Sequence, residues 1–347
     1  MLSPENCQGP EPSFQSVGTV DHFGSAMGIS INGVNRALPH YPKLSIFGYR
    51  NLCFNRKKIT MPKLRIVGAG TPNPTPSRWG TCFILEICGQ RLMIDCGPAS
   101  TYKMYKMGIP STSVSNLFFT HLHSDHVADY LCFLMTRFDQ SIGTERDLNV
   151  YGPSPIKKIT ETIWSANGGV FWFDVEARIN HPMSIHAFHT RGGKGDRPPP
   201  QVKVTEYIEG KVAEGEGWVC YAREVKHAQP YIACYGFRFE TDEGIVAFSG
   251  DTAPTESVVE LARSADLFVM EAVHREEKIQ TFPSVISESG TLSAGRMAAE
   301  AGAKRLVINH QSPTLDPPEE TTQGISEVKS VYNGALYWAH DMMDISW

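Results

Sequence analysis

The stretch FFTHLHSDHVADY, residues 118–130, joins an apolar run to a dense group of metal-binding side chains. Three histidines and one aspartate fall within six positions: His121, His123, Asp125 and His126. Neutral imidazole and carboxylate groups together suit Zn²⁺ or a similar divalent ion. Because alternate side chains of an extended chain point the same way, His121 and His123 can bind one metal. Asp125 and His126 lie past the apolar run, where the chain turns, and can face a second ion.

Three more residues of ligand type follow apolar runs of β character. His227 follows REVK, Asp251 follows IVAFSG, and His310 follows KRLVIN. Taken singly, each is a common surface or core residue. Together with the H-x-H-x-D-H cluster, they predict one metal site assembled from the ends of several strands.

The surrounding pattern mixes strands and helices. From residue 61 onward, short runs rich in β-branched residues end at Gly, as in LRIVGAG, TCFILEICG and QRLMIDCG. The segments VVELARSADLFVMEA and SAGRMAAEAGAKRLVINH each predict a helix, a turn and a buried strand. We therefore expect two sheets with helices on their outer faces.

Composition limits the class of protein. The chain has 347 residues, a formal net charge of −5 and eight cysteines, none of them in a C-x-x-C pair. This charge gives no general attraction to nucleic acid or to an anionic membrane. No apolar run reaches the roughly 18 residues that span a bilayer, and no signal peptide is recognised, so we expect a cytoplasmic protein. Residues 1–60, rich in Gly, Ser, Asn and Pro, predict a poorly ordered extension before a catalytic domain at 61–347.

The ordered set of H-x-H-x-D-H, a later His, SGDT and a final His resembles the metallo-β-lactamase superfamily over roughly residues 61–345. The resemblance implies an α+β fold, a four-layer αββα sandwich, with the metal site at one edge of the two sheets. By position it implies two divalent ions, expected to be Zn²⁺. The first would be bound by His121, His123 and His227, the second by Asp125, His126 and His310, and Asp251 would bridge them.

Two segments, VGAGTPNPTPSRWGTCFIL and AGAKRLVINHQSP, are similar to the ribonuclease Z and arylsulfatase-like branch. Ribonuclease Z carries a substrate arm between the positions of His227 and Asp251, but these residues are only 24 positions apart here. It also has a catalytic His in the neighbourhood where this chain has Glu288 or Gly290. Both departures argue against tRNA processing.

The resemblance implies a hydrolase in which a metal-bridging hydroxide is the nucleophile. We expect cleavage of an ester, lactone, sulfate-ester or related bond in a small molecule, with nucleic acid and membranes not among the partners and a homodimer left open. Two alternatives of other classes are a phosphodiesterase or ribonuclease Z-like nuclease, and an iron-dependent redox enzyme of the same fold. The catalytic candidates are Asp125, Asp251 and His274, and participation of Glu288 in proton transfer is left open.

An insertion at residues 165–222 is the least regular part of the predicted domain. It contains Trp172, Phe173 and a tract rich in Gly and Pro. Long loops at strand ends often form pocket walls, so one hypothesis is a lid whose aromatic side chains face the metals. The other is a surface insertion whose aromatic side chains pack on the sheet.

Overall fold

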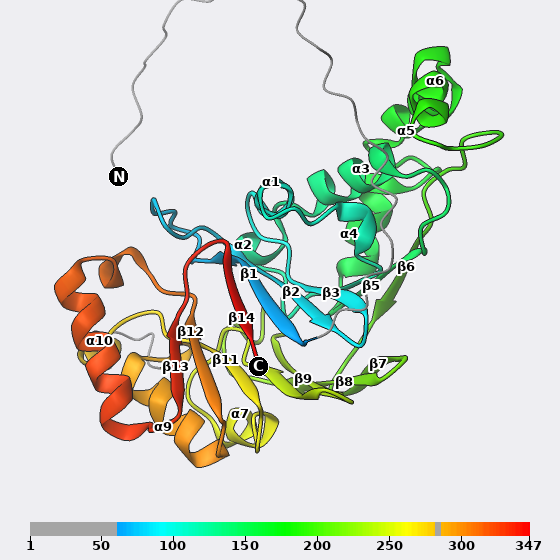
Figure 1. Ribbon diagram of the computed structural model, residues 1–347. Helices are drawn as coiled ribbons and strands as arrows, with labels where there is room; N and C mark the ends of the chain where they lie inside the picture. Colours follow the sequence, from blue (N-terminus) through cyan, green and yellow to red (C-terminus); the bar gives the residue numbers. More distant parts are fainter. Residues whose placement is uncertain (1–60, 282–285) are drawn as a thin grey trace, which may run out of the picture. The chain divides into compact units, whose positions relative to one another are not determined.

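The computed structural model of the chain describes residues 61–281 and 286–347 (Figure 1). The expected N-terminal extension at residues 1–60 lies outside this part. Residues 61–347 fall within a single compact unit. Two seven-stranded mixed sheets form its centre.

The first sheet has the strand order β14-β1-β2-β3-β4-β5-β6. Its β1, β2 and β3 pair antiparallel, whereas β3, β4, β5 and β6 pair parallel. Its strands are β1 (Lys63–Ala69), β2 (Thr81–Ile87), β3 (Gln90–Ile94), β4 (Asn116–Phe118), β5 (Leu148–Gly152), β6 (Val202–Glu206) and β14 (Met343–Ser346).

The second sheet has the order β13-β12-β11-β10-β9-β8-β7, in which the strands from β13 to β10 pair parallel and those from β10 to β7 pair antiparallel. Because β8 and β10 both run antiparallel to β9, and β10 runs parallel to β11 and β12, four strands end at the same edge. Its strands are β7 (Gly210–Gly215), β8 (Trp218–Glu224), β9 (Tyr235–Thr241), β10 (Gly244–Phe248), β11 (Leu267–Glu271), β12 (Arg305–Asn309) and β13 (Ala335–Trp338).

The helices lie on the outer faces of the two sheets, as Figure 1 shows for α1, α3 and α4 on one side and α7, α9 and α10 on the other. The α-helices are α1 (Ser100–Lys106), α2 (Ser124–Val127), α3 (Tyr130–Gln140), α4 (Ile156–Trp164), α5 (Trp172–Asn180), α6 (Pro182–Thr190), α7 (Glu256–Leu261), α8 (Glu276–Thr281), α9 (Thr291–Ala301) and α10 (Pro318–Val331). Short 3₁₀ turns occur at Ser111–Ser113 and Pro313–Leu315.

Three clusters of apolar side chains fill the spaces between the layers of sheets and helices. One lies between the sheets and includes Phe118, Phe237 and Val307. A second joins the first sheet to α3 and α4, and a third joins the second sheet to α7, α9 and α10. The predicted strands are thus buried on both faces, which explains their nearly continuous apolar runs. The expected four-layer αββα sandwich is confirmed.

Residues 165–222 form α5, α6, β6, β7 and most of β8, so part of the predicted insertion supplies edge strands to both sheets. Trp172 is half-buried against the second apolar cluster, whereas the Phe173 side chain is 67% exposed. Arg178 of α5 forms an ion pair with Asp139 of α3. The α5–α6 pair therefore packs beside α3 (Figure 1), and its role as a lid stays a prediction.

Within the described residues, no helix is both long enough and apolar enough to cross a membrane.

Replacing Phe118 by Ala tests the inter-sheet cluster. The fully buried Phe118 ring stacks on Tyr151 at 4.8 Å between centroids and meets the edge of Phe239 at 5.3 Å. We expect Phe118→Ala to lower the free energy of unfolding by about 3–5 kcal/mol, measured by chemical denaturation. The exposed Phe173→Ala is the matched control and should change it by less than about 0.5 kcal/mol. Equal losses in the two variants would contradict this packing.

Candidate metal centre

The His-rich segment is fixed by backbone contacts to the loop that follows β3. Asp95 N donates to Phe118 O at 2.8 Å, and Cys96 N donates to His126 O at 2.7 Å. Gly97 lies so close to α2 that a Cβ atom there would be 2.0 Å from Asp125 O. Only glycine fits this approach without a shift of the backbone. The loop after β3 thereby determines where α2 begins and which way its side chains point.

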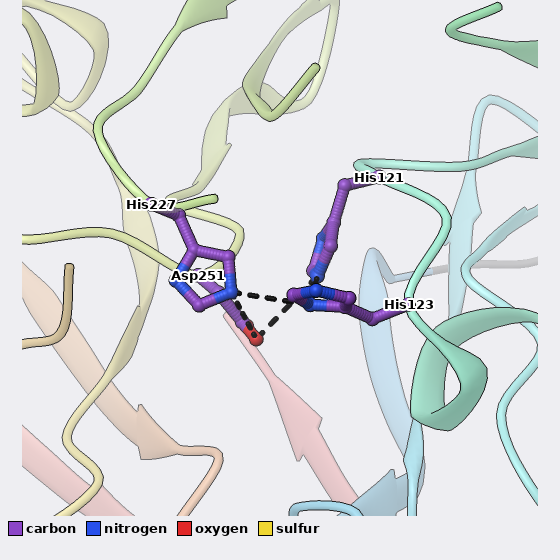
Figure 2. Close-up of side chains that lie close together, drawn as sticks. All are labelled: His121, His123, His227 and Asp251. Atoms are coloured by element: carbon purple, nitrogen blue, oxygen red, sulfur yellow. Dashed lines mark hydrogen bonds and ion pairs between the residues drawn. The ribbon is translucent and has the colours of Figure 1, made fainter. Parts of the chain in front are cut away.

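One group of ligand-type side chains consists of His121, His123, His227 and Asp251, drawn in Figure 2. The His123 Nδ1 atom lies 3.0 Å from His121 Nε2 and 3.2 Å from His227 Nε2. The Asp251 Oδ2 atom lies 3.6 Å from His121 Nε2 and 3.9 Å from His227 Nε2. Four ligand atoms from three separate loops thus face one point.

A second group consists of Asp125, His126, Asp251 and His310, all buried. The Asp251 Oδ2 atom is 3.2 Å from both His126 Nε2 and His310 Nε2. Asp125 Oδ2 is 3.0 Å from His310 Nε2 and 3.6 Å from His126 Nε2. Asp251 therefore belongs to both groups, and the structure brings together all seven residues singled out in the sequence.

These separations fit tetrahedral metal coordination. A zinc ion with Zn–N distances of about 2.0–2.1 Å holds neighbouring ligand atoms about 3.3 Å apart. The separations given above lie between 3.0 and 3.9 Å, and all ligand atoms of each group lie within 4.8 Å of one another. The donor set of imidazole and carboxylate groups also matches the preference of divalent transition metals.

The pKa shifts divide the cluster. Burial by itself would lower the pKa of His126 and of His310, but Asp251 and the other nearby carboxylates outweigh it and raise both pKa values, so a metal would displace a proton from these two rings on binding. Burial lowers the pKa of His121 and of His123, so both imidazoles are neutral at pH 7. Burial by itself would raise the pKa of Asp251, but His310, His126 and His121 outweigh it and hold that pKa well below its usual value. Neutral imidazole and ionised carboxylate are the forms that bind a metal.

Four imidazoles face the site through Nε2: those of His121, His126, His227 and His310. The first three have a hydrogen-bond partner at Nδ1. The Thr120 hydroxyl lies 3.1 Å from His121 Nδ1. Asp95 Oδ2 accepts from His126 Nδ1 at 2.8 Å, and Ser287 O accepts from His227 Nδ1 at 2.8 Å. Asp95 also accepts from Thr120 N and Oγ1, at 2.8 and 2.9 Å. Such outer contacts fix the ring orientation and the tautomer of a metal ligand.

His274 and Glu288 stand apart from these two groups. The His274 Nδ1 atom lies 2.8 Å from Thr314 Oγ1 and 2.9 Å from Ser312 Oγ, and the residue belongs to neither ligand group. Burial raises the pKa of Glu288, while His310 and His227 act in the opposite direction. Glu288 is therefore within electrostatic range of both ligand groups.

Glu271 lies beside the metal centre but is not among the site residues predicted from the sequence. Its side chain is 2% exposed, and Oε1 accepts from Thr252 N and from Ser289 N, both at 2.9 Å. The sequence does contain an indication of its role. Glu271 is the carboxylate at the end of the buried apolar run LFVM, just as other ligand-type residues follow the ends of other apolar runs. Glu271 thereby connects the loop after Asp251 with the segment that precedes α9.

Comparisons with known proteins agree with this geometry. A family model described as "Anti-Pycsar protein Apyc1" matches residues 62–189, which include the His-rich segment. Ribonuclease Z from Mycobacterium bovis is 28% identical over 266 residues, which are 75% of this chain and 89% of that protein. Ribonuclease Z from Mycobacterium marinum is 29% identical over 267 residues, with 75% and 90% covered.

Solved structures share the fold at low sequence identity. The metallo-β-lactamase fold protein YhfI from Bacillus subtilis has a TM-score of 0.63 and 17% identity, and the match covers 83% of this chain and 100% of that one. The short form of human tRNase Z, ELAC1, has a TM-score of 0.57 and 19% identity, with 82% and 98% covered.

One expectation from the sequence is wrong. A small-molecule substrate was expected and nucleic acid was not, but the relatives that cover three quarters of the chain are ribonucleases by name. The net charge of −5 averages over the whole chain, whereas a phosphate group responds to the local field, which bound metal ions dominate. The net charge of the whole chain therefore gives no evidence against RNA as a substrate. The sandwich fold, the paired ligand groups and these relatives indicate a metal-dependent hydrolase of the metallo-β-lactamase fold that is similar to ribonuclease Z.

Proposed function

We propose that this chain is a phosphodiesterase that cleaves RNA with two zinc ions. The observation that carries the proposal is the shared carboxylate of Asp251, which belongs to both ligand groups. Paired metal ions a few ångströms apart are typical of phosphatases and nucleases, because together they stabilise the attacking and the leaving oxygen. The ribonuclease Z relatives support RNA as the substrate.

Zinc is the proposed metal because of the donor atoms. Five imidazoles and two carboxylates favour a borderline-soft ion, whereas Mg²⁺ and Ca²⁺ prefer sites made of oxygen atoms. We assign His121, His123 and His227 to the first ion, Asp125, His126 and His310 to the second, and Asp251 to both.

The chain's own residues then hold and orient this centre. Zinc held by these residues would supply an acidic bound water and positive charge beside the phosphoryl oxygens. Asp95 and the Ser287 carbonyl keep a proton on Nδ1 of His126 and His227, so each Nε2 lone pair faces the site. His274 remains the proposed proton donor to the leaving oxygen, and Ser312 links it to the loop that carries His310.

Metal content tests the proposed ligand assignment. We expect two zinc ions per wild-type chain, about one after His123→Ala or His310→Ala, and a loss at both positions after Asp251→Ala, because the last change removes the shared ligand. Mass spectrometry of dialysed protein measures this, with Asp344→Ala as the control because Asp344 forms exposed ion pairs on β14. Stoichiometric iron with little zinc, or one zinc in every variant, would count against the assignment.

Hydrolysis assays test the substrate class. The zinc-loaded chain should cleave an end-labelled structured RNA and bis(p-nitrophenyl) phosphate, and a chelator should abolish both activities. Asp251→Ala should lower kcat by about 10²–10³-fold or more, since the charge that stabilises the transition state is lost. Asp344→Ala should act like wild type. If the loaded enzyme hydrolysed p-nitrophenyl acetate but neither phosphodiester, the proposal would be abandoned.

A further inference from the structure

His310 differs from the other imidazoles that face the site through Nε2. Among the described residues, its Nδ1 atom is buried and has no hydrogen-bond partner. Glu271 Oε2 is 3.7 Å from it, which is too long for a direct hydrogen bond. A metal at Nε2 requires the neutral ring to carry its proton on Nδ1. That proton needs an acceptor, because a buried donor left unpaired is costly.

Two buried acceptors without partners line the same cavity as His310: Glu271 Oε2, which is 3.7 Å from its Nδ1 atom, and Asn309 Oδ1. Glu271 and Asn309 are register neighbours on the parallel strands β11 and β12. Val269 and Val307, two positions earlier on the same strands, belong to the cluster between the sheets. Because side chains alternate along a strand, Glu271 and Asn309 also face the space between the sheets.

A small cavity occupies that space. Its volume is about 20 Å³, and it adjoins the second ligand group. Its walls include the polar residues Asp95, His126, Asp251, Glu271, Asn309 and His310 and the apolar side chains of Phe83, Phe248 and Val269. A single water needs about 10–15 Å³ on this measure, so the cavity has room for one water and not for two. Buried waters of this kind bond to about three otherwise unpaired polar groups.

We propose that this cavity is the binding site of one buried water that accepts a hydrogen bond from His310 Nδ1 and donates to Glu271 Oε2 and Asn309 Oδ1. Burial and Asp251 raise the pKa of Glu271, whereas the positive charge of bound metal ions would favour its ionised form. With Glu271 ionised, the ring proton has an acceptor, and each of the two oxygen atoms receives one proton of the water. Glu271 and Asn309 thus become positioning residues, which act on the metal ligand through the water.

The remaining contacts of Glu271 make it a rigid anchor for the water. Because Oε1 already accepts from Thr252 N and Ser289 N, the carboxylate cannot turn toward His310 without breaking both bonds. A bridging water covers the 3.7 Å separation at nearly the enthalpy of a direct bond.

High-resolution crystals of the zinc-loaded full chain test the water directly. We expect one density peak at about 2.7–3.2 Å from each of the three atoms. The proposal is overturned if the cavity holds no density, or if Glu271 Oε2 bonds directly to His310 Nδ1. This measurement needs no substitution and so does not depend on whether a variant folds.

A zinc-affinity measurement tests the positioning role. Asn309→Leu keeps the side-chain volume but removes an acceptor, and should weaken zinc binding by about 10-fold or more in a chelator competition. The control is Asn116→Leu, another buried Asn, at the start of β4 and away from the ligands. Equal zinc affinity in the two variants would refute the role of Asn309.

NMR of the ¹⁵N-labelled imidazoles supplies a third readout. Wild type should show a slowly exchanging Nδ1 proton on His310, and a rapidly exchanging proton would contradict the water. None of these readouts involves a substrate, so a failure of RNA cleavage and a failure of the water site are distinguishable.

Discussion

A single buried carboxylate joins the two halves of the metal centre. Asp251 follows β10 of the second sheet, and its Oδ2 atom lies 3.2 Å from His126, which follows β4 of the first sheet, and 3.2 Å from His310, which follows β12. Removing such a charge from water is costly unless opposite charges or hydrogen bonds surround it. The histidines meet that requirement, and in doing so they fix how the edges of the two sheets meet. A divalent ion bound to the neutral imidazoles would balance the same carboxylate in their place.

Much of this centre could be predicted because His121, Asp251 and His310 lie within three residues of the end of a buried apolar strand. A strand buried on both faces appears in the sequence as a continuous apolar run, so its end is easy to recognise, and parallel strands bring their carboxyl ends to one edge. Neither step depends on loop conformation. Two sheets with helices outside and a metal site at the strand ends could therefore be predicted from the pattern, whereas the αββα sandwich and the assignment of the seven ligands were implied by the resemblance to the metallo-β-lactamase superfamily.

Other features depended on contacts between distant segments. The partners of Glu271 are backbone amides of Thr252 and Ser289, which no spacing along the chain reveals. The range 165–222 was harder still, because its strands β6 and β7 are edge strands with partly exposed faces and a weak apolar pattern. The expectation of a small-molecule substrate was wrong for a different reason. The net charge of the whole chain describes the average surface and not the electric field at a metal centre.

The ligands are also widely spaced along the chain, and this spacing has a consequence for folding. Asp125 and His310 are 185 positions apart yet lie in contact at 3.0 Å. In the unfolded chain these residues meet only after a long loop has closed, so the complete ligand set forms late, once both sheets have docked. A metal that binds only the native arrangement shifts the folding equilibrium by mass action. Metal supply would then set the fraction of folded chains as well as the number of active sites.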